Sequence, residues 1–250
     1  MRNFRRRKVN GKKYNDIVVR PNGDLVNGFN LIYNFKNAHK IRGYNVAILR
    51  SFDKGATWES QAKIVDKLRT ATASSPDNGA PVRTGDIIPE IAAGPEGNLY
   101  LVWQDARFNG FDEIAFSMSS DGGSNWSSTI KINKTPGGIG TNGQAFTPSV
   151  QVGADGTVAV TYYDFRNKDG GSDLKTDYFL AHCHGGCDNA NNWEETRITP
   201  NSFDMSQAPV ARGFFTRDYE LGTAGSDFFA FFSQPHGSDP ASIFFGKVGP

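Results

Sequence analysis

The residue types best suited to chemistry in this chain are arginines, carboxylates and a tyrosine, and they occur together in short polar segments. Two of these segments share the pattern Asp-x-Arg directly after an apolar run: Asp105 with Arg107, and Asp164 with Arg166. The planar guanidinium group of arginine binds a carboxylate through two parallel hydrogen bonds. We therefore interpret both segments as ligands for an acidic substrate. A salt bridge that only pins the loop is the structural alternative.

A third segment places a tyrosine between two carboxylates. Arg217, Asp218, Tyr219 and Glu220 follow one another in the sequence. A carboxylate beside a phenol accepts its proton, which offsets an ordinary phenol pKa of about 10. The segment therefore places a phenol beside two possible proton acceptors, and Arg217 is a candidate for a further substrate ligand. A tyrosine that merely packs on an inner strand is the structural alternative.

Two more carboxylates, Asp86 and Glu90, stand close together in a fourth segment. Most glycoside hydrolases use a pair of carboxylates as acid and base or nucleophile. Asp86, Glu90 and Asp164 are therefore candidates for such a pair.

Two copies of an eight-residue turn indicate the elements that position these segments. Residues 51–58 and 119–126 each read Ser-x-Asp-x-Gly-x-(Thr or Asn)-Trp after a short apolar run. In such a turn the aspartate caps amide groups, glycine supplies a positive φ and tryptophan packs on the sheet. We expect a structural role for Ser51, Asp53, Gly55, Trp58, Ser119, Asp121, Gly123 and Trp126.

Strands and glycine turns repeat four times around these two turns. The order strand, turn, strand, loop, strand, turn, strand is typical of a four-stranded antiparallel blade. The sequence therefore predicts an all-β chain folded as a β-propeller, in a single domain over residues 1–250. Blades are expected at about residues 14–66, 84–133, 146–199 and 214–248. Residues 4–10 resemble an outer strand, which either closes the last blade or finishes a blade upstream.

The third blade carries both cysteines, Cys183 and Cys187, where the Asp turn is expected. The favoured interpretation is a disulfide that closes the loop, which indicates an oxidising compartment. The alternative is a metal site with His182 and His184, although four ligands so close in sequence seldom reach tetrahedral geometry. We therefore expect no cofactor and no metal at this loop. Whether a structural calcium ion binds elsewhere in the chain stays open.

Bulk composition limits the partners of the chain. Lys and Arg number 27 against 26 Asp and Glu, for a net charge of +1, so no global field attracts nucleic acid or an anionic membrane. No apolar stretch approaches the ~20 residues of a membrane span. The first residues also lack the apolar core of a signal peptide, so a leader of an exported protein is expected to lie outside this chain.

With these turns the chain resembles the sialidase superfamily, whose β-propellers carry Asp-box repeats, and within it the bacterial exo-sialidase-like branch. Residues 51–58 match the Asp-box throughout, and residues 119–126 depart from it only at Asn125. The resemblance implies six blades, so the four recognised here form either part of a larger ring or a reduced ring. It also implies an extracellular or periplasmic enzyme with Tyr219 as nucleophile. The Arg-Ile-Pro motif of the family is absent.

Three hypotheses on function remain open. The first is a sialidase-like exo-glycosidase that removes terminal sialic acid or a related acidic sugar from glycans. The second is a non-catalytic propeller that binds a glycan or a protein on the same face, and the third is a hydrolase of another polysaccharide. Propeller topology predicts the two Asp turns on one face, and the blade connections with the Asp-x-Arg segments on the opposite face.

Overall fold

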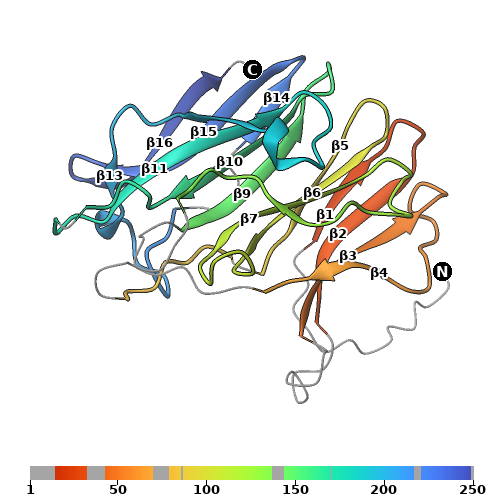
Figure 1. The fold of residues 1–250 in the computed structure, drawn as a ribbon, viewed down its shortest axis with the longest axis horizontal. Coiled ribbons are helices and arrows are strands. Elements are labelled where there is room, and N and C mark those ends of the chain that lie inside the picture. The colour runs from red at the N-terminus through yellow and green to blue at the C-terminus, as the bar shows by residue number, and fades with distance from the viewer. Residues whose placement is uncertain are drawn as a thin grey trace.

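The computed structural model describes residues 15–32, 43–69, 79–85, 87–136, 144–169, 171–216 and 221–248. Within these residues the chain forms four antiparallel β-sheets, which follow one another in sequence order from the N-terminal to the C-terminal side (Figure 1). Two short 3-10 helices, η2 (Ala190–Asn192) and η3 (Met205–Gln207), lie in the connections. The predicted all-β propeller architecture is confirmed.

Each sheet is a meander of neighbouring strands, and we call the four sheets blades 1 to 4. Blade 1 consists of β1 (Asn15–Val19), β2 (Leu25–Ile32), β3 (Tyr44–Ser51) and β4 (Lys63–Lys67). Blade 2 consists of β5 (Glu90–Ala93), β6 (Leu99–Asp105), β7 (Glu113–Ser119) and β8 (Ile130–Lys131). Blade 3 consists of β9 (Ala145–Val152), β10 (Val158–Asp164), β11 (Lys175–Cys183) and β12 (Glu194–Arg197), with β13 (Phe203–Asp204) added to β11. Blade 4 consists of β14 (Leu221–Ala224), β15 (Asp227–His236) and β16 (Asp239–Val248).

The blades stack face to face, so a strand in the middle of the stack is buried on both sides. Strand β10 shows this, because all seven of its residues are buried. Side chains of a strand alternate between the two faces of its sheet. Val160 therefore packs with Val102 of blade 2, whereas Tyr163 packs with Phe232 of blade 4. This stacking brings the first strands together, since β5 contacts both β1 and β9, and β9 contacts β14.

The Asp turns form as their residue pattern predicts. In blade 1 the Oδ1 atom of Asp53 accepts hydrogen bonds from Ser51 Oγ at 2.9 Å and from Thr57 N at 2.7 Å. Gly55 has a φ of 90°, a conformation that glycine adopts without steric cost. Ser119, Asp121 and Asn125 repeat these contacts in blade 2. A short-range network of this kind holds the turn between the third and fourth strands.

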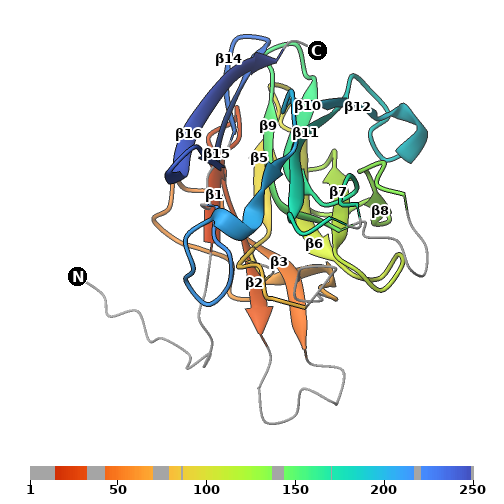
Figure 2. The same ribbon diagram turned by 90° about the vertical axis from the view of Figure 1, so that its left-hand side faces the viewer.

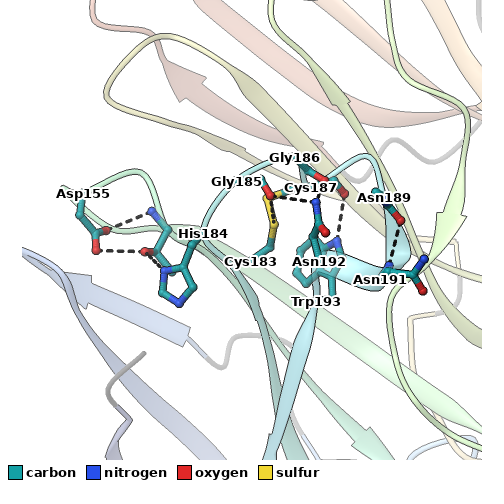
Figure 3. The surroundings of a disulfide bond; sticks show 11 residues. Asp155, Cys183, His184, Gly185, Gly186, Cys187, Asn189, Asn191, Asn192 and Trp193 are labelled. Atoms are coloured by element: carbon teal, nitrogen blue, oxygen red, sulfur yellow. Dashed lines mark hydrogen bonds between the residues drawn. A yellow bond between two sulfur atoms is a disulfide. The ribbon is translucent and has the colours of Figure 1, made fainter.

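Blade 3 closes the corresponding turn with a disulfide between Cys183 and Cys187 (Figure 3). Trp193 lies beneath this loop, buried, and its Nε1 donates to the carbonyl oxygen of Cys187 at 2.9 Å. The indole packs edge-on against Phe116 of blade 2, with ring centroids 4.9 Å apart. The loop thus keeps the tryptophan of the Asp turn and replaces its hydrogen-bonded cap with a covalent bond.

Residues 4–10, expected as an outer strand, lie outside the described residues, and their place in the ring stays a prediction. Among the residues that are described, no helix is long and apolar enough to cross a membrane.

Candidate functional site

The first Asp-x-Arg segment follows β6 of blade 2, and its arginine contacts blade 1. Asp105 ends strand β6, and its Oδ1 accepts from the backbone N–H of Arg107 at 2.9 Å. Its Oδ2 accepts from Trp103 Nε1 at 2.9 Å and pairs with Arg107 Nη2 at 2.8 Å. The other terminal nitrogen of Arg107 bonds Asp66 on β4, the outer strand of blade 1. The guanidinium group therefore points away from the first strands and toward a neighbouring outer strand.

The second segment repeats the Asp–Arg pairing in blade 3, but its arginine bonds the outer strand of the same blade. Asp164 Oδ1 accepts from the backbone N–H of Arg166 at 2.6 Å, and Asp164 Oδ2 pairs with Arg166 Nη2 at 2.6 Å. Arg166 also forms two hydrogen bonds with Glu195 on the outer strand β12, one of them at 3.0 Å. Its guanidinium carbon lies 3.9 Å from the ring centroid of Phe179. Tyr162 donates its hydroxyl to the same Glu195.

Burial and charge act against each other in this cluster. Burial raises the pKa of Asp164 above its ordinary value, although Arg166 opposes the rise. Burial also works against ionised Glu195, but hydrogen bonds from Arg166 hold the pKa of Glu195 below its usual range. Burial likewise raises the pKa of Tyr162 well above that of free tyrosine. Tyr162 and Glu195 therefore look like a nucleophile and its base, but Tyr162 is 0% exposed and a substrate cannot reach it.

Both arginines thus have their terminal nitrogens bonded to protein oxygens on outer strands. Their role as substrate ligands stays a prediction. The predicted residues Asp86, Arg217, Asp218, Tyr219 and Glu220 lie outside the described residues. Of the predicted catalytic set, the structure describes Glu90, the first residue of β5.

Glu90 belongs to a polar arrangement along the inner edge of the stack. Its Oε2 accepts from the backbone N–H of Val150 in β9, the first strand of the next blade, at 3.3 Å. Asp16 of β1 accepts in the same way from the backbone N–H of Ile91 in β5. A first strand is the edge of its sheet, so its outward N–H groups have no partner within the sheet. A carboxylate from the preceding blade supplies that partner in each case.

Two amide side chains accompany the two carboxylates. Gln104 Oε1 accepts from the backbone N–H of Thr147 in β9 at 2.8 Å, and Asn30 Nδ2 donates to the carbonyl oxygen of Ile87 just before β5 at 2.9 Å. Asn30 and Gln104 are 1% and 2% exposed. Blades 1 and 2 therefore each present one carboxylate and one amide to the inner edge of the following blade. We call the set Asp16, Asn30, Glu90 and Gln104 the inner-edge site.

The sequence contains a signal for this set that motif searching missed. Asp16 and Glu90 both stand seven residues before a turn glycine, Gly23 and Gly97 respectively. Asn30 and Gln104 both stand seven residues after the same glycines. An alignment of blades 1 and 2 on their first turn would therefore have selected all four residues.

A strained residue adjoins the inner-edge site. Thr147 has a φ of 52°, which is unfavourable for a β-branched side chain, and it lies where the register of β9 against β10 shifts. Its backbone N–H is held by Gln104, and its Oγ1 donates to the carbonyl oxygen of Thr84 at 3.2 Å. Gln104 in turn donates to Asp112 Oδ2 at 3.1 Å. Strain of this kind persists where surrounding contacts fix it, and it concentrates at functional sites.

The surroundings of the two carboxylates differ. The Asp16 side chain is exposed at the rim, but the protein packed beside it raises its pKa, against the opposing hydrogen bonds from the N–H groups of Ile17 and Ile91. Glu90 is partly buried next to Ile91, the residue that Asp16 contacts. A raised carboxyl pKa is one feature of a general acid. No group of three or more His, Cys, Asp or Glu residues suited to a metal ion occurs among the residues that the structure describes.

Comparisons with known proteins agree with the fold. No protein-family model matches the chain, and no curated protein sequence matches it. Among solved structures, a Hadza microbial sialidase aligns with a TM-score of 0.55 and 15% identity, over 94% of this chain and 43% of the sialidase. An α-L-arabinanase of Penicillium chrysogenum, solved with arabinobiose, aligns with a TM-score of 0.52 and 16% identity, over 94% of this chain and 62% of the arabinanase.

The chain therefore shares the β-propeller fold of these two solved structures, in agreement with the predicted fold. It spans less than two thirds of the length of either solved chain. At this identity the likeness concerns the fold, and function has to be argued from the site.

Proposed function

We propose that this propeller is a glycoside hydrolase that cleaves a glycan at the inner-edge site, with Asp16 as general acid and Glu90 as nucleophile or base. One observation carries the proposal: Asp16 and Glu90 occupy equivalent positions on neighbouring first strands, and Asp16 contacts the residue next to Glu90. The shared fold with a sialidase and an arabinanase supports the reaction class, because both of those proteins are named for cleaving glycosidic bonds.

The two carboxylates would have different tasks. Burial shifts the pKa of Asp16 upward, which is the direction that a general acid needs to donate to the leaving oxygen of a glycosidic bond. Glu90 is already fixed by the N–H of Val150, and such a bond stabilises an ionised carboxylate. The ionised group would either attack the sugar carbon or deprotonate a water molecule. Asn30 and Gln104 would hold the backbone of the following blade at Ile87 and at Thr147.

Release of a terminal sialic acid or a related acidic sugar is the second candidate activity. The Asp turns and the shared fold favour it, with Tyr219 as nucleophile, Asp218 or Glu220 as its base and Arg217 as ligand of the substrate carboxylate. The ion pairs of Arg107 and Arg166 weigh against this candidate, because guanidinium groups already paired with buried carboxylates bind a further carboxylate less readily. Binding of a glycan without hydrolysis is the third candidate. The disulfide in blade 3 supports a secreted protein for all three.

The test is turnover of 4-methylumbelliferyl sialoside, 4-methylumbelliferyl α-L-arabinofuranoside and a panel of plant and bacterial polysaccharides. Asp16→Asn and Glu90→Gln should each lower kcat/KM on the cleaved substrate by about 100-fold or more. Asp188→Asn, which changes an exposed carboxylate on the disulfide loop, is the matched control and should leave kcat/KM unchanged.

The same experiment separates the candidates. Sialoside turnover that is lost in Tyr219→Phe and kept in Glu90→Gln would replace the carboxylate pair by the tyrosine mechanism. Glycan-array binding by the folded wild type, without turnover of any substrate, would identify a binding propeller and reject both catalytic assignments.

A further inference from the structure

Two segments between the blades repeat a short sequence pattern. Residues 80–85 read Ala-Pro-Val-Arg-Thr-Gly, and residues 208–213 read Ala-Pro-Val-Ala-Arg-Gly. The first segment precedes β5, and the second lies in the loop between η3 and β14, drawn in blue to the left of the centre in Figure 2. The two segments pair, because the N–H of Arg83 donates to the carbonyl oxygen of Phe214 at 2.8 Å and the N–H of Phe214 donates to that of Pro81 at 2.9 Å. We call residues 79–85 and 208–216 together the arginine clip.

The backbone of the arginine clip is closely packed. Gly213 has a φ of 137°, and a Cβ atom added there would lie 2.6 Å from the carbonyl oxygen of Pro81, so this position requires glycine. Arg212 has a φ of 65°, which is unusual for a residue other than glycine. Thr84 attaches the clip to the inner-edge site, because its Oγ1 accepts a hydrogen bond from Gln104 Nε2 at 3.0 Å. The clip is therefore a fixed structure beside the inner-edge site.

The arginine clip carries two cations and no anion. Arg83 and Arg212 are its only charged residues, and both are exposed. Arg107 and Arg166 are paired with buried aspartates, whereas neither arginine of the clip forms an ion pair with another described residue. Two cations without a counter-charge create a local positive potential, although the chain as a whole is nearly neutral.

The side chain of Arg83 is held in place without a carboxylate. Val82 and Thr84 are 2% and 6% exposed, and side chains of an extended segment alternate in direction, so Arg83 points to solvent. Its guanidinium carbon lies 4.4 Å from the ring centroid of Phe215. A guanidinium group stacked on a ring still presents the N–H groups at its edge, which suit two hydrogen bonds to a carboxylate or sulfate. A side chain ordered in advance loses less conformational freedom when it binds.

We propose that the arginine clip binds an acidic polysaccharide, through carboxylate or sulfate groups on sugars beside the bond that is cleaved. The choice of a polysaccharide rests on the proposed function, and the choice of an anion rests on the two unpaired cations. Because Thr84 joins the clip to Gln104, a glycan chain held at the clip lies next to the inner-edge site.

Isothermal titration calorimetry of the full chain at low salt tests the proposal with polygalacturonate, dextran sulfate and neutral dextran. The wild type should bind one or both anionic polymers, and the comparison between them distinguishes carboxylate from sulfate recognition. It should not bind dextran. Arg83→Gln and Arg212→Gln should each weaken binding by about 10-fold, the usual effect of losing a charge-assisted hydrogen bond. Added salt should weaken the binding of the wild type as well.

Lys54→Gln is the matched control. It removes an exposed cation from the Asp turn of blade 1, at the opposite end of the strands, and should leave the affinity unchanged. Equal weakening by Lys54→Gln and Arg83→Gln would overturn the proposal, because binding would then follow diffuse charge. A wild type that binds neither anionic polymer, or binds dextran equally well, would also overturn it. Near-ultraviolet circular dichroism verifies that each variant is folded.

Glu90→Gln separates this proposal from the proposed function. This variant should lose turnover and still bind the anionic polymer with the affinity of the wild type. Turnover that survives in Glu90→Gln would reject the carboxylate pair and leave the measured binding at the clip intact. Turnover by a wild type that binds no anionic polymer would reject the clip alone.

Discussion

Replacing Arg166 by methionine should destabilise the fold severely. The side chain of Arg166 is 12% exposed, and it neutralises two carboxylates: Asp164, which is 0% exposed, and Glu195, which is 8% exposed. Methionine has a similar length and still covers Phe179, so the change removes the charge and its hydrogen bonds while it keeps most of the packing. The variant leaves two buried carboxylates without a cation.

The expected magnitude follows from that burial. Breaking a buried ion pair by removing one partner costs about 3 to 5 kcal/mol, because the remaining charge is desolvated and unpaired. For a chain of this size each kcal/mol lowers Tm by about 2 to 4 °C, so the expected fall is roughly 6 to 20 °C. The deficit should shrink at lower pH, since protonation of Asp164 and Glu195 removes the unpaired charges.

Thermal and urea unfolding measure the effect, and the chain offers a matched control. Lys175 pairs with Asp169 at the surface, where the side chains are 38% and 56% exposed. Lys175→Met should therefore lower Tm far less than Arg166→Met. The opposing hypothesis is that Arg166 binds the substrate. A Tm of Arg166→Met within about 2 °C of the wild type, together with a raised KM on the substrate identified for the wild type, would refute the structural reasoning.

Three further predictions concern the turns and the blade 3 surface. Burial and the neighbouring His184 lower the pKa of His182, so the unfolded chain binds a proton at a higher pH than the folded chain does. The free energy of unfolding should therefore fall as pH drops below 6.5. His182→Gln should abolish that slope in pH-dependent urea unfolding. Hydrogen bonds from Asn125 lower the pKa of Asp121 to about 2. The ionised Asp121 should therefore stabilise the fold fully above its ordinary pKa of 3.8, and this stabilisation should be lost as pH falls toward 2. Asp121→Ala should remove that acid transition from a Tm–pH profile. Reducing the bond between Cys183 and Cys187 opens a loop of about five residues and should lower the free energy of unfolding by about 2 kcal/mol. Tm in the presence of dithiothreitol should then fall by about 4 to 8 °C. An unchanged Tm despite complete thiol titration would show that the bond adds no stability.

The local turns could be derived from the sequence because their hydrogen bonds stay within a few residues. Ser51 and Asp53 cap a turn that ends at Thr57, and every partner is at most four residues away. A pattern with such short reach specifies its own geometry. The strands beside these turns were likewise recognisable, since their apolar runs recur at the spacing of a blade.

The partners of the charged residues could not be derived in the same way. Arg107 bonds Asp66, 41 positions earlier, and Arg166 bonds Glu195, 29 positions later. Nothing in an Asp-x-Arg pattern says whether its guanidinium group faces a substrate or an outer strand. The tertiary structure makes that choice: the packing of blade 2 on blade 1 brings Asp66 to Arg107, and strand pairing within blade 3 brings Glu195 to Arg166.

The sequence by itself determined the repeating blade, its Asp turns and hence the class of fold. Only the tertiary structure showed that Asp16 and Glu90 cap the inner edges of successive blades, because these bonds join strands of different blades that lie far apart in the sequence. The physical reason is that an edge N–H group donates to whichever oxygen the neighbouring sheet brings near it, and the packing of the sheets fixes which oxygen that is.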